Sequence, residues 1–433
     1  MDAPPPPSVP PEVTAAPPAE AAADDLAPAA GSLSTWELVP LVASLMALNA
    51  LAIDIMLPAL SHIASEFAIT NPNDRQLVVV AYVLGFGTPQ LVYGPLSDRV
   101  GRRGVVLVSL VGYAVAGAAC AMVGSFEALL AMRFVQGVFA AGCRVVAIAV
   151  VRDVFQGRGM ARIMSLVMTV FMVIPILAPS LGQAVLFVAP WEWCFYVLAI
   201  AGALIFGWVY FRLAETLPAE QRSPAGLKNT LGAYLAVVRN RTSAGYTLAG
   251  GIIFASLFAY VSASEQIFRE VFEVGDAFAL YFAAVALALS VSNFLNSRLV
   301  ERFGMRRLSH LAVLGFTLTS GLLYALTFLK GDHLSLFLPL FTLCFAFFGA
   351  IGANFNAMAM EPLGHVAGTA SAAYGFMTTT LAGVIGGLIA RSYDGTTIPL
   401  VRGLFVLGLV CLGLVLFTER GRLFGADGPA ERA

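Results

Sequence analysis

The chain has 433 residues, of which 59% are hydrophobic and only 12% are charged, whereas about 25% of the residues are charged in an ordinary soluble domain. Its mean hydropathy of +0.83 leaves too few charges for a solvated surface, which excludes a water-soluble globular protein. The formal net charge of −1 excludes the basic surface that binds nucleic acid by neutralising phosphates. We therefore expect membrane lipid, and no nucleic acid, among the partners.

Residues 1–34 form a segment rich in proline and alanine that contains no lysine or arginine. A segment of this composition cannot bury a hydrophobic core, so we predict a disordered cytoplasmic tail. The segment also lacks the positive start and the apolar stretch of a signal peptide. The first transmembrane helix is therefore expected to direct membrane insertion.

From Leu38 onward, the sequence contains repeated apolar stretches. A bilayer core about 30 Å thick requires about 20 apolar residues in a helix. Because the stretches lack the two-residue alternation of barrel strands, their backbone groups must be satisfied within helices. The fold class is therefore all-α. We predict twelve spans, at residues 38–60, 76–96, 104–124, 128–150, 161–187, 193–213, 244–264, 276–298, 307–328, 334–356, 367–390 and 398–418.

Lysine and arginine are unevenly divided between the loops on the two sides of these spans. If the N-terminus is inside, eighteen of the 25 lie in inner loops and tails and five in outer loops, and Arg133 and Arg144 lie within the fourth span. Positive residues are retained on the cytoplasmic side of a membrane. We therefore predict a multi-pass membrane protein with both termini in the cytoplasm.

The longest polar connection separates six spans from six, and the two halves resemble each other. GPLSDRVGRR (94–103), after the second span, aligns with SRLVERFGMR (297–306), after the eighth, so that Asp98 meets Glu301 and Gly101 meets Gly304. Two parallel six-helix repeats around a central site are typical of transporters. The predicted segments are the tail 1–34, a six-helix bundle 35–213, a cytoplasmic linker 214–243, a second bundle 244–418 and a cytoplasmic tail 419–433.

Several motifs resemble those of the major facilitator superfamily. GPLSDRVGRR resembles the signature loop between its helices 2 and 3, RFVQG (133–137) the helix 4 motif of its proton-coupled members, and PILAPSLGQ (175–183) the helix 5 motif of antiporters. The resemblance extends over residues 36–420 and implies twelve helices in two pseudo-symmetric six-helix bundles. Further segments are similar to the Bcr/CflA drug-resistance branch, namely DIMLPAL (54–60), VRDVF (151–155), WEWCF (191–195), LAETL (213–217) and EPLGHVAGTASA (361–372).

Three positions depart from the family pattern. Ala178 stands before the central proline of the helix 5 motif, where glycine is usual, so a looser backbone approach is expected there. In the second half, Met305 stands where the signature loop would have a basic residue, and Glu301 replaces the aspartate. The gating function of the second loop therefore does not follow from the resemblance alone.

The resemblance implies a drug:proton antiporter, acting as a monomer, that exports small-molecule drugs or antibiotics across a bacterial inner membrane. A proton-coupled importer of a small nutrient is the alternative. A polytopic membrane enzyme is disfavoured because Glu265, Glu361 and Asp394 each stand alone, without a metal set or a nucleophile beside a base. A channel is disfavoured because twofold repeats with a few central charges suit alternating access better than a charge ring.

Asp54 and Arg133 are the candidate residues for proton coupling. Ionisable residues deep in a span are functional candidates because their isolated burial costs several kcal/mol. Both residues lie about five or six positions outward of the middle of their spans, so they sit at similar depth. They could meet directly or through water if helices 1 and 4 line one cavity, as the family implies, and a static buried ion pair is the alternative interpretation.

Other polar and aromatic residues of the spans are candidates for a substrate cavity. Arg144 returns to the helix face of Arg133 after eleven residues, where it could bind an anion or a carbonyl group or instead reach toward the cytoplasmic interface. Polar groups and aromatic rings here could contact a flat drug or serve helix packing. The candidates are Asn49, Tyr82, Phe86, Gln136, Arg144, Phe254, Phe258, Tyr260 and Asn293.

The resemblance also assigns gating residues. In the family, the acid at the position of Asp98 sits at the start of helix 11, here near Gly368 and Thr369, where the helix dipole favours negative charge. That contact would hold the outward-facing state. The gating-loop candidates are Gly94, Asp98, Arg99, Gly101, Arg102 and Arg103, and the antiporter motif contributes Pro175, Pro179 and Gly182.

The five cysteines are scattered singly, and the four histidines lack metal-ligand spacing. We therefore expect no disulfide framework and no metal site. No cofactor is expected, since the proton serves as the coupling ion.

Overall fold

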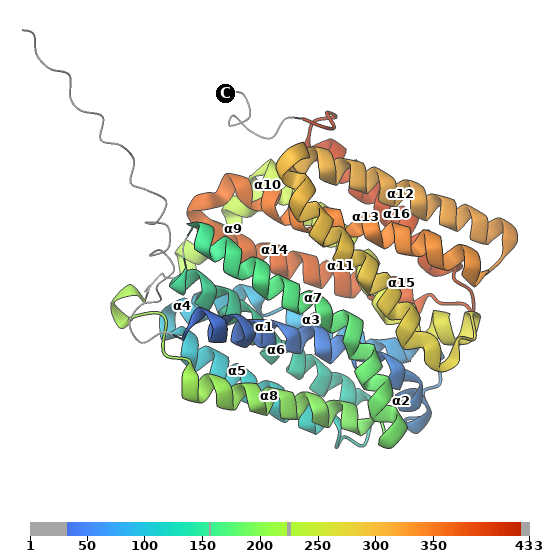
Figure 1. Cartoon of the computed structure of the whole chain (residues 1–433), viewed down its shortest axis with the longest axis horizontal. Coiled ribbons are helices and arrows are strands. Elements are labelled where there is room, and N and C mark those ends of the chain that lie inside the picture. Colours follow the sequence, from blue (N-terminus) through green and yellow to red (C-terminus); the bar gives the residue numbers. More distant parts are fainter. Residues whose placement is uncertain (1–32, 156, 223–226, 426–433) are drawn as a thin grey trace, which may run out of the picture.

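The computed structural model of the chain describes residues 33–155, 157–222 and 227–425, and regular secondary structure in these ranges is helical throughout (Figure 1). The predicted all-α class is therefore confirmed. The tail predicted at 1–34 lies almost entirely outside the described residues.

Helices α1 to α8 form the first half, α9 lies in the connection, and α10 to α16 form the second half. The first half comprises α1 (Thr35–Asp54), α2 (Leu60–Glu66), α3 (Leu77–Gly87), α4 (Gln90–Val100), α5 (Arg102–Cys120), α6 (Phe126–Val154), α7 (Gly157–Val188) and α8 (Glu192–Arg212). The connection and the second half comprise α9 (Leu227–Arg239), α10 (Arg241–Gln266), α11 (Phe278–Phe303), α12 (Met305–Lys330), α13 (Leu334–Met360), α14 (Ala367–Leu381), α15 (Gly387–Arg391) and α16 (Ile398–Thr418).

Eleven helical stretches of the described residues are long and apolar enough to cross a membrane, and a bent pair supplies a twelfth. The bent pair is Pro72–Gly87 with Gln90–Val100, which meet at 42°. Pro89 lies at this break, and proline removes a backbone donor and clashes with the preceding turn. The second predicted span, 76–96, is therefore two helices and not one.

The two halves meet where α7 packs on α11 and where the bent pair α3 and α4 packs on α14. In Figure 1 the first half lies below the second, with α7 beside α11, and these two helices are in contact. Helices α3 and α4 contact α14. The apolar windows of α1, α6 and α10 are 67%, 61% and 72% buried, whereas those of α7, α8 and α11 are 25 to 28% buried. Helices α1, α6 and α10 therefore form the centre of the bundle.

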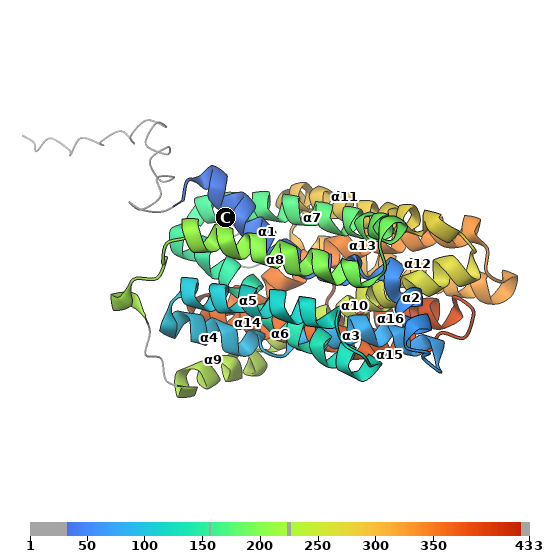
Figure 2. The ribbon, with the colours of Figure 1, turned by 90° about the horizontal axis from the view of Figure 1, so that it is seen from below.

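The connection between the halves contains a helix where the sequence predicts only a polar linker. Helix α9 packs on α14 (Figure 2). The Tyr234 hydroxyl donates a hydrogen bond to the Leu91 carbonyl of α4, at 2.7 Å. Burial of the Tyr234 hydroxyl and the nearby charge of Asp98 raise the pKa of Tyr234 to about 12. The linker thus touches both halves.

Two glycines let α3 and α6 approach at backbone distance. A Cβ on Gly85 would overlap the carbonyl oxygen of Phe134, and a Cβ on Gly137 would overlap that of Tyr82. Small residues of this kind allow close helix packing in membranes. The approach brings the aromatic side chains of α3 next to the arginines of α6.

We predict that Gly85→Ala lowers the melting temperature of the purified protein in detergent, because the added methyl group meets backbone that cannot rotate away. Overpacking of this kind costs about 1–3 kcal/mol. Gly413→Ala is the matched control, since nothing lies within 4 Å of a Cβ at that helical glycine. Equal melting temperatures of the two variants would contradict the close approach of α3 and α6.

Candidate functional site

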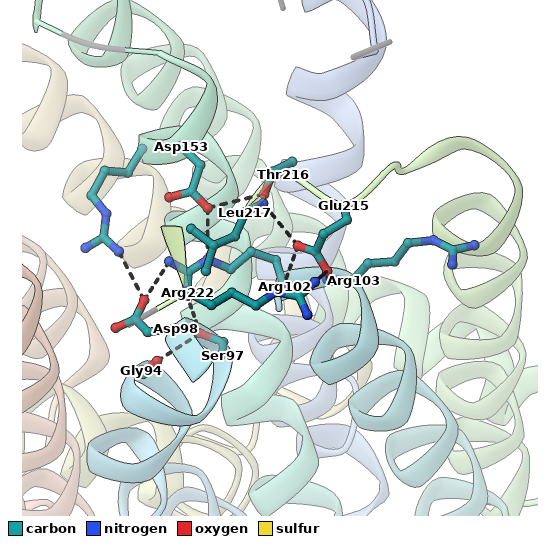
Figure 3. Close-up of polar contacts among 11 residues, drawn as sticks. Gly94, Ser97, Asp98, Arg102, Arg103, Asp153, Glu215, Thr216, Leu217 and Arg222 are labelled. Atoms are coloured by element: carbon teal, nitrogen blue, oxygen red, sulfur yellow. Dashed lines mark hydrogen bonds and ion pairs between the residues drawn. The ribbon is translucent and has the colours of Figure 1, made fainter. Parts of the chain in front are cut away.

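Arg102 is the centre of a polar network at the end of the bundle where α4 meets α5, here called the Arg102 end. Its side chain is 3% exposed and binds the Asp98 carboxylate at 2.6 Å and the Asp153 carboxylate at 2.8 Å. It also donates to the Ser97 hydroxyl at 2.7 Å (Figure 3). Two carboxylates and a hydroxyl around one guanidinium make a rigid joint between α4, α5 and α6.

Glu215 caps α5 in the same network. Its carboxylate accepts hydrogen bonds from the backbone nitrogens of Arg102, at 2.8 Å, and Arg103, at 3.2 Å. A negative charge at a helix N-terminus is stabilised by the free N–H groups and the helix dipole. Gly101 precedes these residues with φ +102°, and a Cβ there would overlap the Glu215 carboxylate. Only glycine therefore fits this turn without strain.

The remaining gating candidates differ from Arg102 in their contacts. Arg103 donates to the carbonyls of Leu213 and Tyr210 on the end of α8, at 2.9 and 2.8 Å. Arg99 is exposed, and a Cβ on Gly94 would meet nothing within 4 Å. The contact of Asp98 with Gly368 and Thr369 that the resemblance implies lies outside the side chains that the structure describes, so it stays a prediction.

The second half repeats this joint with different residues. Gly304 has φ +78° between α11 and α12, as Gly101 has between α4 and α5. Arg306 binds Glu361 at 3.3 Å and Glu419 at 3.2 Å. Although Met305 replaces a basic residue, the neighbouring Arg306 supplies the charge that ties the second half together at this end.

At the opposite end, here called the Arg75 end, polar contacts join the two halves to each other. Arg75 of the first half forms ion pairs with Glu265, at 3.3 Å, and with Glu270. Asp74 pairs with Arg391 at 2.8 Å, and Gln76 and Gln266 share a buried hydrogen bond. In the described part of the chain, the ion pairs at the Arg102 end stay within one half, so ion pairs cross between the halves only at the Arg75 end.

Asp54 lies at the end of α1 between the two halves. It is 5% exposed, and among the described residues its carboxylate has no hydrogen bond or ion pair. From the second half, Tyr260 of α10 lies close enough for the charge of Asp54 to act on it. The Tyr260 hydroxyl also has no hydrogen-bond partner among the described residues. Both groups are therefore available to a proton, to water or to a ligand.

The chain around Asp54 is shaped by two features. Pro58 lies four residues after Asp54 and has no N–H group to continue the helix, so α1 ends at Asp54. On the other side, a Cβ on Gly182 of α7 would overlap the Ile55 carbonyl. The antiporter motif, with Pro175 and Pro179 inside α7, thus packs its glycine directly against the segment that follows Asp54. Despite Ala178, the backbone approach is close.

Arg133 is completely buried and holds backbone instead of a carboxylate. Its guanidinium donates to the carbonyls of Ala52, at 2.9 Å, and Val78, at 3.2 Å, and to the Gln136 side chain at 2.7 Å. It also lies 4.4 Å from the ring centroid of Tyr82. No ion pair joins Arg133 to Asp54 among the described residues, although its partner Ala52 is only two residues away from Asp54. Arg133 is therefore a positioning residue for the end of α1.

Arg144 lies at the contact between the halves. Its guanidinium is 5.6 Å from the ring centroid of Phe86 on α3, and its charge acts on Tyr374 of α14. Phe86 lies near the middle of the second span. The Arg144 side chain therefore points toward the middle of the bundle and not toward the end of α6 at Val154. Gln136, by contrast, is fully buried inside the first half between Arg133 and Gly117.

The other cavity candidates divide into packed and partly accessible side chains. Tyr82 is fully buried and donates a hydrogen bond to Asn49 at 3.1 Å. Tyr260 packs among Phe282, Phe341 and Phe345. The partly accessible candidates are Asn49, Phe254, Phe258 and Asn293.

Sequence reasoning assigned no function to several residues of these networks. Asp153 and Glu215 lie inside the VRDVF and LAETL segments. The sequence shows these two motifs but does not indicate which residue each acid contacts. Glu265 pairs with Arg75 and Glu361 with Arg306, which the sequence did not predict. These pairs join positions distant in sequence, which leaves no local pattern.

We expect Arg102→Gln to lower the melting temperature, because Asp98 and Asp153 lose their shared counter-charge. Breaking a buried ion pair costs about 3 kcal/mol or more. Arg99→Gln is the control from the same loop, since Arg99 is exposed and exposed substitutions usually change stability by less than about 0.5 kcal/mol. Equal effects of the two variants would show that Arg102 does not hold the joint.

Comparison with known proteins places this architecture in a family. Residues 42–387 match the Major Facilitator Superfamily. The chain is 31% identical over 373 residues to the uncharacterized MFS-type transporter YdgK of Bacillus subtilis (strain 168), covering 86% of this chain and 92% of the relative. It is 29% identical to a bicyclomycin resistance protein homolog of Haemophilus influenzae, covering 87% and 93%. It is 30% identical to the multidrug resistance protein MdtL of Salmonella heidelberg, covering 77% and 82%.

Solved structures agree on the fold. The xylose transporter XylE of E. coli, in a partially occluded inward open conformation, matches with a TM-score of 0.69 at 13% identity, covering 89% of this chain and 99% of that one. The predicted family and fold are thus confirmed. The chain belongs to the Major Facilitator Superfamily and is a multi-pass membrane transporter, not an enzyme.

Proposed function

We propose that this protein is a proton-coupled exporter of small-molecule drugs or antibiotics, with Asp54 as the group that carries the proton. The observation that carries the proposal is the state of Asp54, which is buried between the halves without a partner among the described residues. Intramembrane carboxyl groups are costly and mark ion or proton pathways. A static ion pair with Arg133, the alternative interpretation, is not supported, because Arg133 binds backbone carbonyls.

The environment of Asp54 is suited to loading and releasing a proton. Burial disfavours a charged carboxylate, whereas water and nearby cations favour it. The proton is therefore exchanged when the segment after α1 gains or loses contact with water. This segment also packs against the antiporter motif of α7 and against α10. A movement of the two halves relative to each other therefore changes the surroundings of Asp54 directly.

Alternating access is supported by the unequal ends of the bundle. The ion pairs that cross between the halves lie at the Arg75 end, whereas the Arg102 end has joints within each half. The distribution of arginine and lysine favours a cytoplasmic Arg102 end and cytoplasmic termini. Under this orientation the described conformation is closed to the outside, and each half moves as a rigid body that is held together by the joint at its inner end.

The direction of transport is proposed from the relatives and from the helix 5 motif. Two relatives are named for bicyclomycin and multidrug resistance, and a bacterial inner membrane is the corresponding location. A monomer suffices, since one chain contains both halves. The alternative, import of a small nutrient with protons, uses the same residues in the opposite direction.

A drug panel tests the proposal in cells with and without the chain. We expect expression to lower the accumulation of at least one compound among bicyclomycin, the neutral chloramphenicol and the cationic ethidium, and an uncoupler to abolish the difference. Accumulation that rises on expression would indicate import. A difference that survives the uncoupler would contradict proton coupling.

Asp54→Asn should separate substrate exchange from coupling to the proton gradient. The variant keeps the shape and polarity of the side chain but cannot release a proton. In proteoliposomes we expect substrate exchange across the membrane to continue while accumulation driven by an imposed pH gradient falls by at least about 100-fold, as for the loss of an essential proton carrier. Asp394→Asn, at an exposed carboxylate, is the control. Retained pH-driven accumulation in Asp54→Asn would overturn the assignment.

A further inference from the structure

Arg144 differs from Arg133, the other arginine of the predicted fourth span. Arg133 is enclosed by three acceptors, whereas Arg144 has no hydrogen bond or ion pair among the described residues. Its side chain is half-buried although it sits on α6, one of the most buried helices. An unpaired guanidinium in this position is costly. Since it contacts Phe86 of α3 and lies near Tyr374 of α14, this half-buried guanidinium lies between the halves, and the described residues leave its hydrogen-bonding capacity free.

The groups around Arg144 come from both halves and are aromatic. Phe86 of the first half lies under the guanidinium at 5.6 Å, stacked on Tyr82 with an interplanar angle of 6°. From the second half, Tyr374 lies close enough to interact electrostatically with the guanidinium. Gly352 lies between Tyr374 and Phe254. The Tyr374 hydroxyl donates a hydrogen bond to the Gly352 carbonyl at 3.5 Å, and a Cβ added to Gly352 would lie 3.4 Å from the Phe254 ring. A ligand here would touch Arg144 and the rings of both halves at once.

Asp54 does not neutralise Arg144. The guanidinium of Arg133 binds at the level of Ala52, and Arg144 follows eleven residues later, about 16 Å further along α6. Proton site and arginine are therefore separate, and a negative group at Arg144 has to come from outside the described side chains.

We propose that the transported substrates include amphipathic organic anions, with an aromatic body and one carboxylate or sulfonate group that binds Arg144. A guanidinium matches such groups with two parallel hydrogen bonds, and the partly accessible ring of Phe254, beside the buried rings of Phe86 and Tyr374, offers an apolar surface for the body. This rests on the proposed export function and specifies its substrate class. Export of an anion and entry of a proton move charge in the same direction, so the membrane potential favours both.

Binding of three compounds with the same ring system tests the proposal on the purified full-length protein in detergent. The probes are 1-naphthoate, 1-naphthalenesulfonate and the neutral 1-naphthamide, measured by calorimetry. We expect the wild type to bind at least one of the anions about tenfold or more tightly than the amide, as for a charge-assisted bidentate contact. Arg144→Gln should lose that preference, Arg144→Lys should retain part of it, and the control Arg298→Gln, at an exposed arginine of α11, should match the wild type.

Two results would overturn the proposal. One is a wild type that binds neither anion better than the amide, including the case of no measurable binding. The other is a folded Arg144→Gln, with wild-type melting temperature, that keeps the preference. If Arg144→Gln does not fold, Arg144→Lys serves as the test instead. The proposal then fails if the lysine variant binds the anions and the amide as tightly as the wild type does. Because binding needs no proton gradient, these results are independent of the drug panel, whose failure would instead contradict proton-driven export.

Discussion

The contact between Arg133 and the end of α1 is the interaction on which the proposed mechanism depends. The last carbonyls of a helix lack partners within that helix, and in lipid no water replaces them. Pro58 ends α1 at Asp54, and Arg133 satisfies the Ala52 carbonyl with its guanidinium. The first span can therefore change from α1 through the short 3-10 turn Leu57–Ala59 into α2 inside the bundle, and Asp54 lies at this change with its carboxylate unpaired among the described residues. In the proposed mechanism, Arg133 acts through this geometry and not by pairing with the acid.

The two ends of the molecule differ in whether their polar contacts lie within one half or between the halves. Joints within each half, around Arg102 and Arg306, keep the six-helix units rigid. Contacts between the halves, around Arg75, are ion pairs and amide hydrogen bonds that water can replace when the halves separate. Apolar contacts at the Arg75 end would resist this exchange more strongly, because opening would expose them to water. A reversible seal of polar groups is the arrangement that alternating access requires.

Much of the fold could be predicted from the sequence, because apolar length and arginine placement depend on local composition. The twelve spans, the repeat and the family followed from these patterns. The break at Pro89 and helix α9 did not, since the apolar run continues across the former and the latter is short. The partners of Arg133 could not be predicted because backbone carbonyls leave no trace in the sequence. The pairing of Arg75 with Glu265 joins distant positions, so only the packed structure reveals it.

The central claim is that Asp54 exchanges a proton when substrate binds. The most direct measurement is the number of protons released on substrate binding by the purified protein in weakly buffered detergent solution, using a compound that the cells export. The account predicts release of about one proton per substrate bound by the wild type near neutral pH, and none by Asp54→Asn with binding retained. Equal proton release from the wild type and from Asp54→Asn would contradict it.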